Sequence, residues 1–478
     1  MSHAHPLDLG QARPGASRRA VLASTIAAGA AGLTAVSAAG ARANPTGAHG
    51  TAPPRQRNQS SMVGVPFEVY DEVRVGIIGL GNRGMGMLPL FDAVPGVRVT
   101  AVCDVRPGLV RDASDRLAAE GSRRPREYSR GPEDYQRLAQ ADDVDFAYIA
   151  TPWEDHYAQG VACLEGGKHV GIELPIATEL DELWSLVDMS EQVQRHCILM
   201  ENCNYGRQEL AMLRMAHDGL FGDITNGHGG YLHDLRDLLF SETYYYNQWR
   251  RKWFAARNRA FYPMHGLAPI AAAMDVNRGD RMTTLQASAS PAHGLADYRE
   301  RHVSADRTDV WAEEYIAGDR VTCMINTEQG RLIRAEDDVC TPRPYSRINT
   351  LAGSRGVLED YPSRIYLEPE HGGHAWQESQ PYLDEYDHWL WQDIGDDAEN
   401  HGGHGGMDYI MIYRLMQCMR QGLEPDIDVY DSAAWSSPVP LSEASLSSGG
   451  PVEIPDFSRG LWSEQRAGLD SERAPLLD

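Results

Sequence analysis

Residues 73–84 read VRVGIIGLGNRG, and this stretch decides the fold. Its first half is a β-branched, apolar run, which is typical of a strand buried on both faces. Its second half is a GxGxxG turn, with Gly79, Gly81 and Gly84 at the fixed positions. In a dinucleotide fold these glycines make the tight turn, admit the pyrophosphate and let the following helix pack, and that helix binds the phosphates at its N-terminus. The stretch therefore predicts a Rossmann domain.

The context of the turn matters, because a lone GxGxxG is a weak signal. Residues 97–102 form a second apolar run that ends in Cys103 and Asp104. Asp104 follows Gly84 by 20 residues, where an acidic side chain binds the adenosine ribose. A carboxylate there favours NAD over NADP, whose 2′-phosphate it would repel, while the nearby Arg106 leaves NADP open. The alternative, a glycine-rich turn with an incidental aspartate, is disfavoured by the order of strand, glycines, helix, strand and acid.

Length and composition describe a chain with room for more than one domain. It has 478 residues, of which 42% are hydrophobic and 23% are charged. Its net charge of −24 argues against a nucleic acid or an anionic membrane as partner, and favours a small neutral ligand. The seven cysteines are odd in number and form no CxxC, so they are expected to be buried thiols and not a disulfide framework.

The first 43 residues are predicted to be a twin-arginine signal peptide that is not part of the fold. Arg18 and Arg19 lie in SRRAVL, a weakly apolar run follows over 23–40, and an Ala-Arg-Ala cleavage site ends at Ala43. The run is too short and too rich in Ala and Gly for a convincing membrane span, so no stable membrane insertion is expected, although an uncleaved anchor stays open. Export in the folded state predicts a periplasmic, cell-surface or secreted protein. Residues 44–70 are expected to be a flexible segment.

Strand and helix patterns alternate between residues 71 and 203, which predicts a doubly wound parallel sheet. The strands and helices expected there, besides those around the glycine turn, lie at 145–150, 157–166, 169–173, 178–194 and 197–201. Beyond 204 the segments become longer, more polar and more aromatic. The strand-like runs and the helix expected there lie at 309–317, 320–326, 330–335 and 408–421.

The first half of the chain resembles the Gfo/Idh/MocA oxidoreductase family. The resemblance rests on GLGNRG, on the strand that ends in CDV, on a TP…H loop over 151–156 and on the step Glu173-Leu174-Pro175. The family usually has Glu-Lys-Pro, and its lysine takes part in sugar oxidation, so Leu174 argues against simple sugar dehydrogenase chemistry. The resemblance implies a set of NAD contacts, which are Gly79, Gly81, Asn82, Arg83, Gly84, Asp104, Thr151, Trp153, His156, Glu173, Leu174 and Asn202.

The second half narrows the resemblance to glycoside hydrolase family 109, which also lacks that lysine. The motifs that carry it, in chain order, are ENCNY at 201–205, GYLHDLR at 230–236, WR at 249–250, YPMHGL at 262–267, PYSR at 344–347 and HGGHGGMD at 401–408. The resemblance implies that residues 204–478 form an α+β domain. Its large, open, mainly antiparallel sheet would cover the nicotinamide and support a homo-oligomer.

Acid/base chemistry on a sugar is predicted for the YPMH loop. Histidine side chains change charge near neutrality and tyrosines can relay a proton, so His265 and Tyr262 suit this work. The alternative is a helix-start turn with Pro263 at its first position and His265 satisfied by backbone. Tyr345 alone could be a loop aromatic packed against prolines. The resemblance places a tyrosine like Tyr345 at the reacting carbons, and makes Tyr231 and Arg250 substrate contacts together with the three catalytic candidates Tyr262, His265 and Tyr345.

A histidine-rich motif near residue 400 suggests a metal, but no metal is expected. His401, His404 and Asp408 have ligand-type side chains, and His371 and His374 add to them. The surrounding glycines do not hold these side chains in a rigid arrangement, so substrate binding or helix capping is favoured over a metal site. Paired carboxylates for ordinary glycosidase chemistry are not identifiable.

The function that the resemblance implies is an exported, NAD-dependent glycosidase similar to α-N-acetylgalactosaminidases. Its substrate would be a small glycoside or a glycan terminus, with NAD tightly bound and regenerated in each turnover. A net sugar oxidoreductase using NAD(P) is the alternative, although Leu174 and export count against it. A non-catalytic sugar-binding protein that keeps NAD is a third class. Anomer, exact sugar and oligomeric state stay open, as does the proton that each of His265 and Tyr345 removes.

Overall fold

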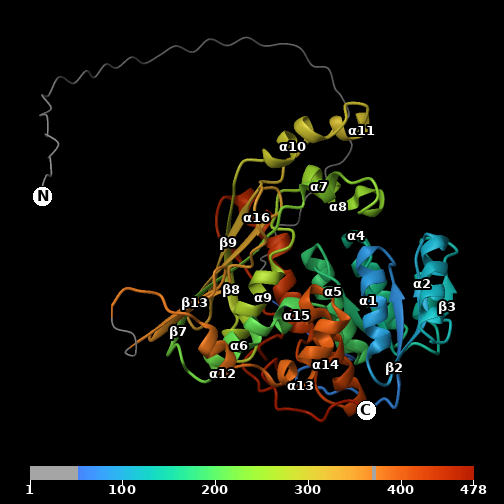
Figure 1. Ribbon diagram of the computed structural model, residues 1–478, viewed down its shortest axis with the longest axis horizontal. Coiled ribbons are helices and arrows are strands. Elements are labelled where there is room, and N and C mark those ends of the chain that lie inside the picture. Colours follow the sequence, from blue (N-terminus) through green and yellow to red (C-terminus); the bar gives the residue numbers. More distant parts are fainter. Residues whose placement is uncertain (1–51, 369–372) are drawn as a thin grey trace, which may run out of the picture. The chain divides into compact units, whose positions relative to one another are not determined.

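The computed structural model describes residues 52–368 and 373–478 (Figure 1). The twin-arginine motif, its cleavage site and His371 lie outside the described residues. Two β-sheets organise this part of the chain, a six-stranded one and an eight-stranded one. They are the two sheets that the sequence and its resemblance predict, and the prediction of the fold class is confirmed.

The first sheet is parallel throughout, in the order β3-β2-β1-β4-β5-β6. Its centre is β1, Val73–Ile78, whose side chains are nearly all buried because helices cover both faces. The other strands are β2 Val97–Cys103, β3 Arg126–Tyr128, β4 Phe146–Ile149, β5 His169–Ile172 and β6 Cys197–Leu199. The connecting helices are α1 Asn82–Ala93, α2 Pro107–Ala119, α3 Tyr135–Ala139, α4 Trp153–Glu165 and α5 Leu180–Val193.

The second sheet is antiparallel except where β7 pairs with β10, in the order β13-β12-β11-β7-β10-β9-β8-β14. Its strands are β7 Ile224–Leu232, β8 Met282–Ala289, β9 Val321–Thr327, β10 Leu332–Asp338, β11 Thr350–Gly353, β12 Gly356–Glu359, β13 Arg364–Leu367 and β14 Val452–Glu453. The runs predicted at 320–326 and 330–335 correspond to β9 and β10. The strand predicted at 309–317 is wrong, because that region holds the short helix α11, Thr308–Trp311, whose Val310 packs into an aromatic cluster away from the sheet.

Helices complete this second part of the chain. In chain order they are η1 Asn202–Tyr205, α6 Arg207–His217, α7 Arg236–Phe240, η2 Tyr246–Gln248, α8 Trp249–Ala256, α9 Met264–Ala273, α10 Gly294–His302, α11, α12 Gln380–Glu385, α13 Trp389–His401, η3 His404–Gly406, α14 Met407–Gln421, α15 Val429–Ser436 and α16 Pro438–Ser448. The helix predicted at 408–421 corresponds to α14.

Helix α9 lies directly on β7, and glycines make this possible. A Cβ on Gly229 would stand 2.1 Å from the carbonyl oxygen of Gly266, and one on Gly266 would stand 1.9 Å from the nitrogen of Gly230. Real Cβ contacts are never so short, so any side chain at these positions would push the helix off the strand. The contact brings the YPMH loop, which leads into α9, next to Tyr231 on β7.

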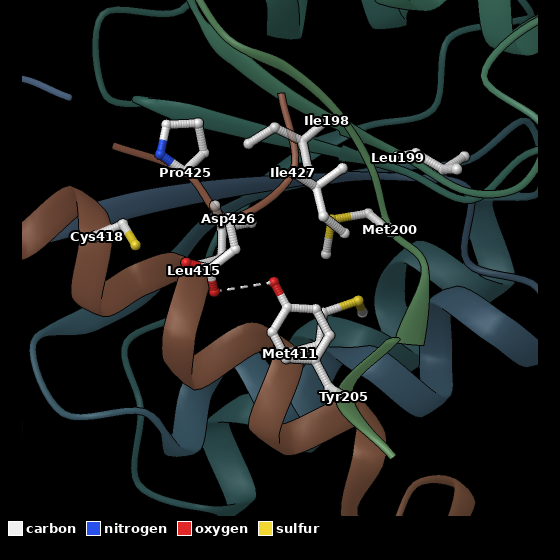
Figure 2. Close-up of a pocket in the computed structure, with 10 residues that line it drawn as sticks. All are labelled: Ile198, Leu199, Met200, Tyr205, Met411, Leu415, Cys418, Pro425, Asp426 and Ile427. Atoms are coloured by element: carbon white, nitrogen blue, oxygen red, sulfur yellow. Dashed lines mark hydrogen bonds between the residues drawn. The ribbon is translucent and has the colours of Figure 1, made fainter. Parts of the chain in front are cut away.

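The C-terminal helices return to the first sheet. Side chains of α14 and β6 face one another across a cavity of about 10 Å³, hardly room for one water molecule (Figure 2). The hydroxyl of Tyr205 donates to Asp426 Oδ2 at 3.4 Å across this contact. Residues 204–478 therefore supply packing for the Rossmann sheet as well as their own sheet.

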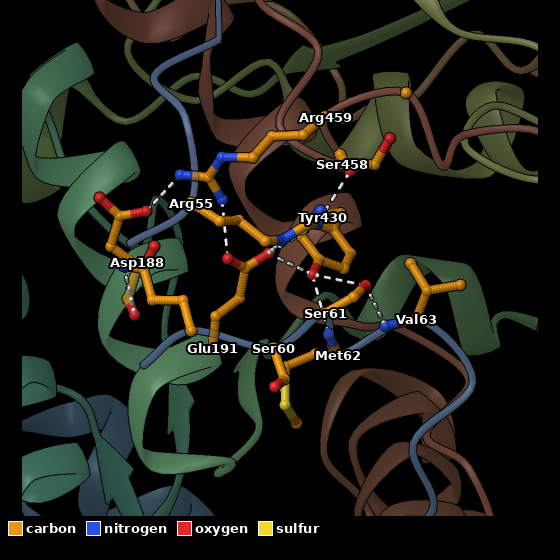
Figure 3. A network of polar contacts seen from close by, with 12 residues as sticks. Arg55, Ser60, Ser61, Met62, Val63, Asp188, Glu191, Tyr430, Ser458 and Arg459 are labelled. Carbon is orange, nitrogen blue, oxygen red and sulfur yellow. Dashed lines mark hydrogen bonds and ion pairs between the residues drawn. The ribbon is translucent and has the colours of Figure 1, made fainter. Parts of the chain in front are cut away.

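The segment from residue 52 to residue 70 packs into the fold, which differs from the flexible segment expected over 44–70. Met62 and Phe67 are 2% and 3% exposed. Glu191 on α5 is fully buried and pairs with Arg55 and Arg459, and it also accepts from the hydroxyl of Tyr430 at 2.7 Å (Figure 3). The composition of residues 44–70 did not predict this packing, because the residues that contact the segment lie far along the chain.

All seven cysteines are buried and free, as expected. Among the helices of residues 52–368 and 373–478, none is long and apolar enough to cross a membrane.

Removing the charge of Glu191 should strongly destabilise the protein, because Arg55 would lose its ion-pair partner and the buried Arg459 would lose one of its two carboxylate partners, Glu191 and Asp188. We expect Glu191→Gln to lower the free energy of unfolding by about 3 kcal/mol, measured by denaturant unfolding. The control is Glu120→Gln, which breaks the exposed pair with Arg116 and should cost under about 0.5 kcal/mol. Equal losses in the two variants would show that the Glu191 network is not a major stabilising contact.

Candidate functional site

The glycine turn has the shape that a dinucleotide requires. Gly79 has φ +91°, and a Cβ there would meet the backbone of Ala150 at 2.7 Å. A Cβ on Gly84 would stand 1.9 Å from the carbonyl oxygen of Gly79, so this glycine lets α1 approach the turn. A Cβ on Gly81 would meet only the Arg106 side chain, at 3.8 Å. The N-cap of α1 has no side-chain cap, which leaves backbone N–H groups for phosphate oxygens. These residues fit a bound dinucleotide.

Asp104 lies beside the turn, as its spacing predicts. Its Oδ2 accepts the backbone N–H of Leu80 at 2.8 Å, and Arg106 pairs with both of its oxygens at 3.0 and 3.1 Å. The carboxylate therefore holds the turn and neutralises Arg106, which favours NAD over a cofactor with an extra phosphate. Its contact with the ribose stays a prediction.

Arg83 joins the turn to two acids from elsewhere in the chain. Its guanidinium donates to Glu173 Oε1 and to Asp408 Oδ2, both at 2.8 Å. Asp408 also accepts from Asn202 at 2.7 Å. Burial alone would raise the pKa of Asp408, but Arg83 and His404 hold it well below its usual range. Arg83, Glu173 and Asn202, predicted as cofactor residues, thus form one charged cluster centred on Asp408.

The loop after β4 carries three further predicted cofactor residues. His156 is enclosed, with one ring nitrogen 2.9 Å from the carbonyl of Thr151 and the other 2.7 Å from that of Pro175. It therefore ties this loop to the Leu174-Pro175 step, a positioning role and not an exposed contact. Trp153 stacks on Tyr262 with ring centroids 6.1 Å apart. Leu174 is 2% exposed, so the position of the family's lysine is an apolar contact here.

The start of α9, which includes the last two residues of YPMH, places His265 in a cluster of aromatic rings. Its Nδ1 lies 2.6 Å from Oε1 of Glu201, and the imidazole is 13% exposed. The rings of Tyr231 and Tyr262 flank it, with centroids 5.2 and 4.9 Å away and steep interplanar angles. The backbone N–H of Tyr262 donates to Asp337 Oδ2 at 3.0 Å, which fixes the loop. The structure brings together the residues that the sequence predicts for acid/base work.

The ring of Tyr345 packs on another side of this aromatic cluster. Its ring lies 6.1 Å from that of Tyr231 and 5.1 Å from that of His233. Arg347 donates to the Tyr345 hydroxyl at 3.2 Å and is itself paired with the buried Glu209. Burial raises the pKa of Tyr345 well above its ordinary value, although Arg347 opposes this, so the phenol keeps its proton at neutral pH.

Arg250 is a buried cation, and some of its hydrogen-bond donors are unpaired. Its guanidinium lies 5.1 Å from the Trp153 ring and 4.9 Å from the Tyr262 ring, and Nη1 donates to Tyr245 at 3.2 Å. Nε and Nη2 have no hydrogen-bond partner among the described residues. Unpaired buried donors are costly, so they suit a polar ligand, as expected for a substrate contact.

A short run of tyrosines, residues 244–246, links the two halves of the site; we call it the tyrosine strap. Asn82 donates to the carbonyl oxygen of Tyr244 at 2.9 Å. The guanidinium of Arg106 lies 4.9 Å from the ring centroid of Tyr246. Because Tyr245 binds Arg250, the strap connects the glycine turn, the Asp104 region and the substrate side.

Three side chains that could bind a metal ion lie close together at a place that the sequence did not indicate. Ligand atoms of Glu201, Cys203 and His265 lie within 4.8 Å of one another. Cys203 Sγ donates to Asn202 Oδ1 at 3.6 Å, and in the chain without a metal burial raises the pKa of this thiol well above its ordinary value. In the HGGH motif, His404 Nδ1 lies 2.8 Å from Asp408, and His401 stacks on Tyr409 with centroids 4.5 Å apart.

Comparison with known proteins decides the family. Residues 205–464 match the family described as "Glycosyl hydrolase 109, C-terminal domain". A protein of Streptomyces coelicolor named "Glycosyl hydrolase family 109 protein" is 61% identical over 465 residues, which cover 96% of this chain and 97% of that protein. This chain belongs to glycosyl hydrolase family 109. A relative of the same name from Saccharopolyspora erythraea is 52% identical over 458 residues, covering 96% and 97%.

The fold of this family 109 protein is also found in solved oxidoreductases. Residues 73–202 match "Oxidoreductase family, NAD-binding Rossmann fold". An NAD binding oxidoreductase from Klebsiella pneumoniae aligns with a TM-score of 0.61 and 16% identity, over 80% of this chain and 99% of that one. Levoglucosan dehydrogenase, solved with NADH and levoglucosan, aligns with a TM-score of 0.60 and 17% identity, over 80% and 100%. At such identities the likeness shows the fold alone, and the family model shows the NAD-binding domain.

Sequence reasoning missed three residues of the site in this family 109 protein. Glu201, Asp337 and Arg347 support His265, Tyr262 and Tyr345 respectively. Glu201 follows a buried strand, where a carboxylate signals a site, but its partner is 64 residues away. Burial raises the pKa of Asp337 to about 6, a perturbation that only the folded chain reveals.

Replacing Gly84 with Ala should abolish NAD retention, because the new Cβ would clash with the Gly79 carbonyl and displace α1. We expect a loss of about 3 kcal/mol in the free energy of unfolding and no NAD in the purified protein. The matched control is Gly86→Ala on the same helix, where a Cβ meets nothing within 4 Å, so stability should rise slightly. Retention of NAD by Gly84→Ala would contradict this account of the turn.

Proposed function

We propose that this family 109 protein is an exported glycosidase that releases terminal α-N-acetylgalactosamine, or a related amino sugar, from a glycoside. The glycine turn and Asp104 would hold NAD tightly, and the cofactor would supply reversible oxidation at C3 of the sugar, so that it is regenerated in each turnover. Between oxidation and re-reduction the sugar would lose its C2 proton and its C1 leaving group and would add water. The observation that carries the proposal is the geometry of His265, held by Glu201 and flanked by Tyr231 and Tyr262, in a family 109 chain that has an NAD-binding Rossmann domain.

His265 is the stronger candidate for the base that removes the C2 proton. Because the phenol of Tyr345 keeps its proton, it suits donation of a hydrogen bond to an oxygen that gains negative charge next to C2. Tyr262 and Tyr231 confine the imidazole, and Arg250 offers two unused donors to polar groups of the sugar. These roles use every residue that the sequence assigned to catalysis or substrate binding.

Net dehydrogenase activity is the competing function. It is supported by the fold, and by the levoglucosan dehydrogenase among the similar structures. Two observations count against it. The position of the family's lysine is the buried Leu174. The tyrosine strap would hinder the cofactor exchange that a dehydrogenase needs in each turnover.

Export and self-association are part of the proposal. The SRRAVL motif supports export by the twin-arginine route, which suits a protein that takes up its cofactor before crossing the membrane. Met324 on β9 and Leu332 on β10 are each 36% exposed, which supports a homo-oligomer built on the open sheet.

The decisive assay is release of para-nitrophenol from para-nitrophenyl α-N-acetylgalactosaminide in heavy water. We expect release, deuterium at C2 of the sugar and no net NADH, and His265→Ala should lower kcat by about 100-fold or more. NADH that accumulates with free sugars would instead identify a dehydrogenase. Binding of NAD and sugar with no turnover of either kind would identify the sugar-binding class.

Weakening the tyrosine strap should speed the loss of NAD. Tyr246→Ala removes the ring over Arg106, an interaction worth about 0.5–1 kcal/mol, so NAD should dissociate about two- to fivefold faster after dilution, measured as the NAD that passes an ultrafilter over time. Trp376→Ala is the control, because it removes an exposed ring from Arg364 and should leave the rate unchanged. An unchanged rate in Tyr246→Ala would remove the strap from cofactor retention.

A further inference from the structure

Glu201 is the most enclosed acid at the site. It follows β6 at the start of η1 and has 0% exposure. Its Oε1 accepts the backbone N–H of Cys203 at 3.0 Å and lies 2.6 Å from His265 Nδ1. Its Oε2 has no hydrogen-bond partner in the part of the chain that the structure describes.

Capping of a short helix does not explain a carboxylate at this position. A Ser or Asn could accept one N–H at a helix start without burying a charge. A buried carboxylate costs several kcal/mol unless partners compensate. Among the described residues, Glu201 is held by His265, by the backbone N–H of Cys203 and by the Cys203 thiol. Strongly buried charges with a specific charge partner gather at functional sites.

We propose that Glu201 is the positioning residue that sets the tautomer and orientation of His265, an assignment that rests on the proposed role of His265 as base. A carboxylate can only accept, so the hydrogen of the neutral imidazole must lie on Nδ1. Nε2 then carries the lone pair, ready to take a proton from the sugar. When it does, the new positive charge lies beside the carboxylate, which stabilises it.

The surroundings fix the direction of the ring. Tyr231 and Tyr262 contact the imidazole edge to face, so rotation about its side-chain bonds would break both contacts and the bond to Glu201. Glu201 comes from the Rossmann part of the chain, whereas His265 comes from the start of α9. The pair therefore aligns the base with the half of the protein that binds NAD.

A metal held by Glu201, Cys203 and His265 is the competing interpretation. Against it, Cys203 Sγ already donates to Asn202 Oδ1 at 3.6 Å, and the Nδ1 of His265 is engaged by Glu201. The purified protein is therefore expected to contain no stoichiometric zinc. Zinc that is present in the protein and lost from Cys203→Ser would overturn the proposal.

The main test is a double-mutant cycle that uses the para-nitrophenyl substrate and the NAD-loaded enzyme. We expect Glu201→Gln to lower kcat about 10- to 100-fold with KM changed less than about threefold. In the His265→Ala background the same substitution should have no further effect, because Glu201 acts only through the imidazole. An equal loss in both backgrounds, or no loss in either, would overturn the proposal.

A matched control separates positioning from stability. Glu191→Gln neutralises another fully buried glutamate, so it should lower the free energy of unfolding but leave kcat unchanged. Glu201→Gln should do the reverse and retain NAD. A loss of kcat in both variants that follows their loss of stability would make Glu201 a merely structural residue.

A spectroscopic measurement on the unmodified chain keeps the proposal testable if the variant fails to fold or the substrate is wrong. Nitrogen NMR of labelled histidine, with the His265 signal assigned by its loss in His265→Ala, should show the hydrogen on Nδ1. A hydrogen on Nε2 would overturn the role of Glu201. If the wild type releases no para-nitrophenol but shows the Nδ1 tautomer, the proposed function fails while the positioning of His265 stands.

Discussion

Two backbone contacts that no side chain can enter determine where the site forms. In the second sheet, Gly266 at the start of α9 touches Gly229 and Gly230 of β7. In the first sheet, Gly84 of α1 touches the carbonyl of Gly79. Each contact sets a helix N-terminus close to neighbouring backbone, and each helix carries part of the candidate site, with Arg83 on α1 and His265 on α9. The positions of these two candidate residues thus depend on glycines, whose lack of a side chain permits the close approach.

Buried ion pairs then join the halves that the glycines position. Asp408, at the start of α14, holds Arg83 of the glycine turn, and Glu201 after β6 holds His265 at the start of α9. Both pairs connect residues from different halves of the chain. A buried pair adds little net stability, but loss of one partner is costly, so such pairs specify one arrangement. Because α14 also packs on β6, residues 205–464 complete the cofactor half as well as the substrate half.

The features predicted correctly are those that depend on residues close together in the sequence. The VRVGII run, the glycine spacing and Asp104 are encoded within some 30 residues, and the structure has them in the expected places. The strand expected at 309–317 failed because its apolar residues serve an aromatic cluster, where burial overrode the strand pattern. Glu201 and Asp337 escaped prediction since their partners are distant in sequence. The packing of residues 52–70 was missed for the same reason, since it depends on Glu191 and Tyr430.

The tyrosine strap would hinder cofactor exchange, and this fits hydrolysis better than net oxidation. A dehydrogenase must open to exchange NADH after each turnover. Here the strap contacts Asn82 and Arg106 on the cofactor side and Arg250 on the substrate side, so opening it would loosen the substrate site as well. A reaction that returns its hydride within one turnover needs no such opening. The same contacts that would slow a dehydrogenase would therefore cost a redox-neutral glycosidase nothing.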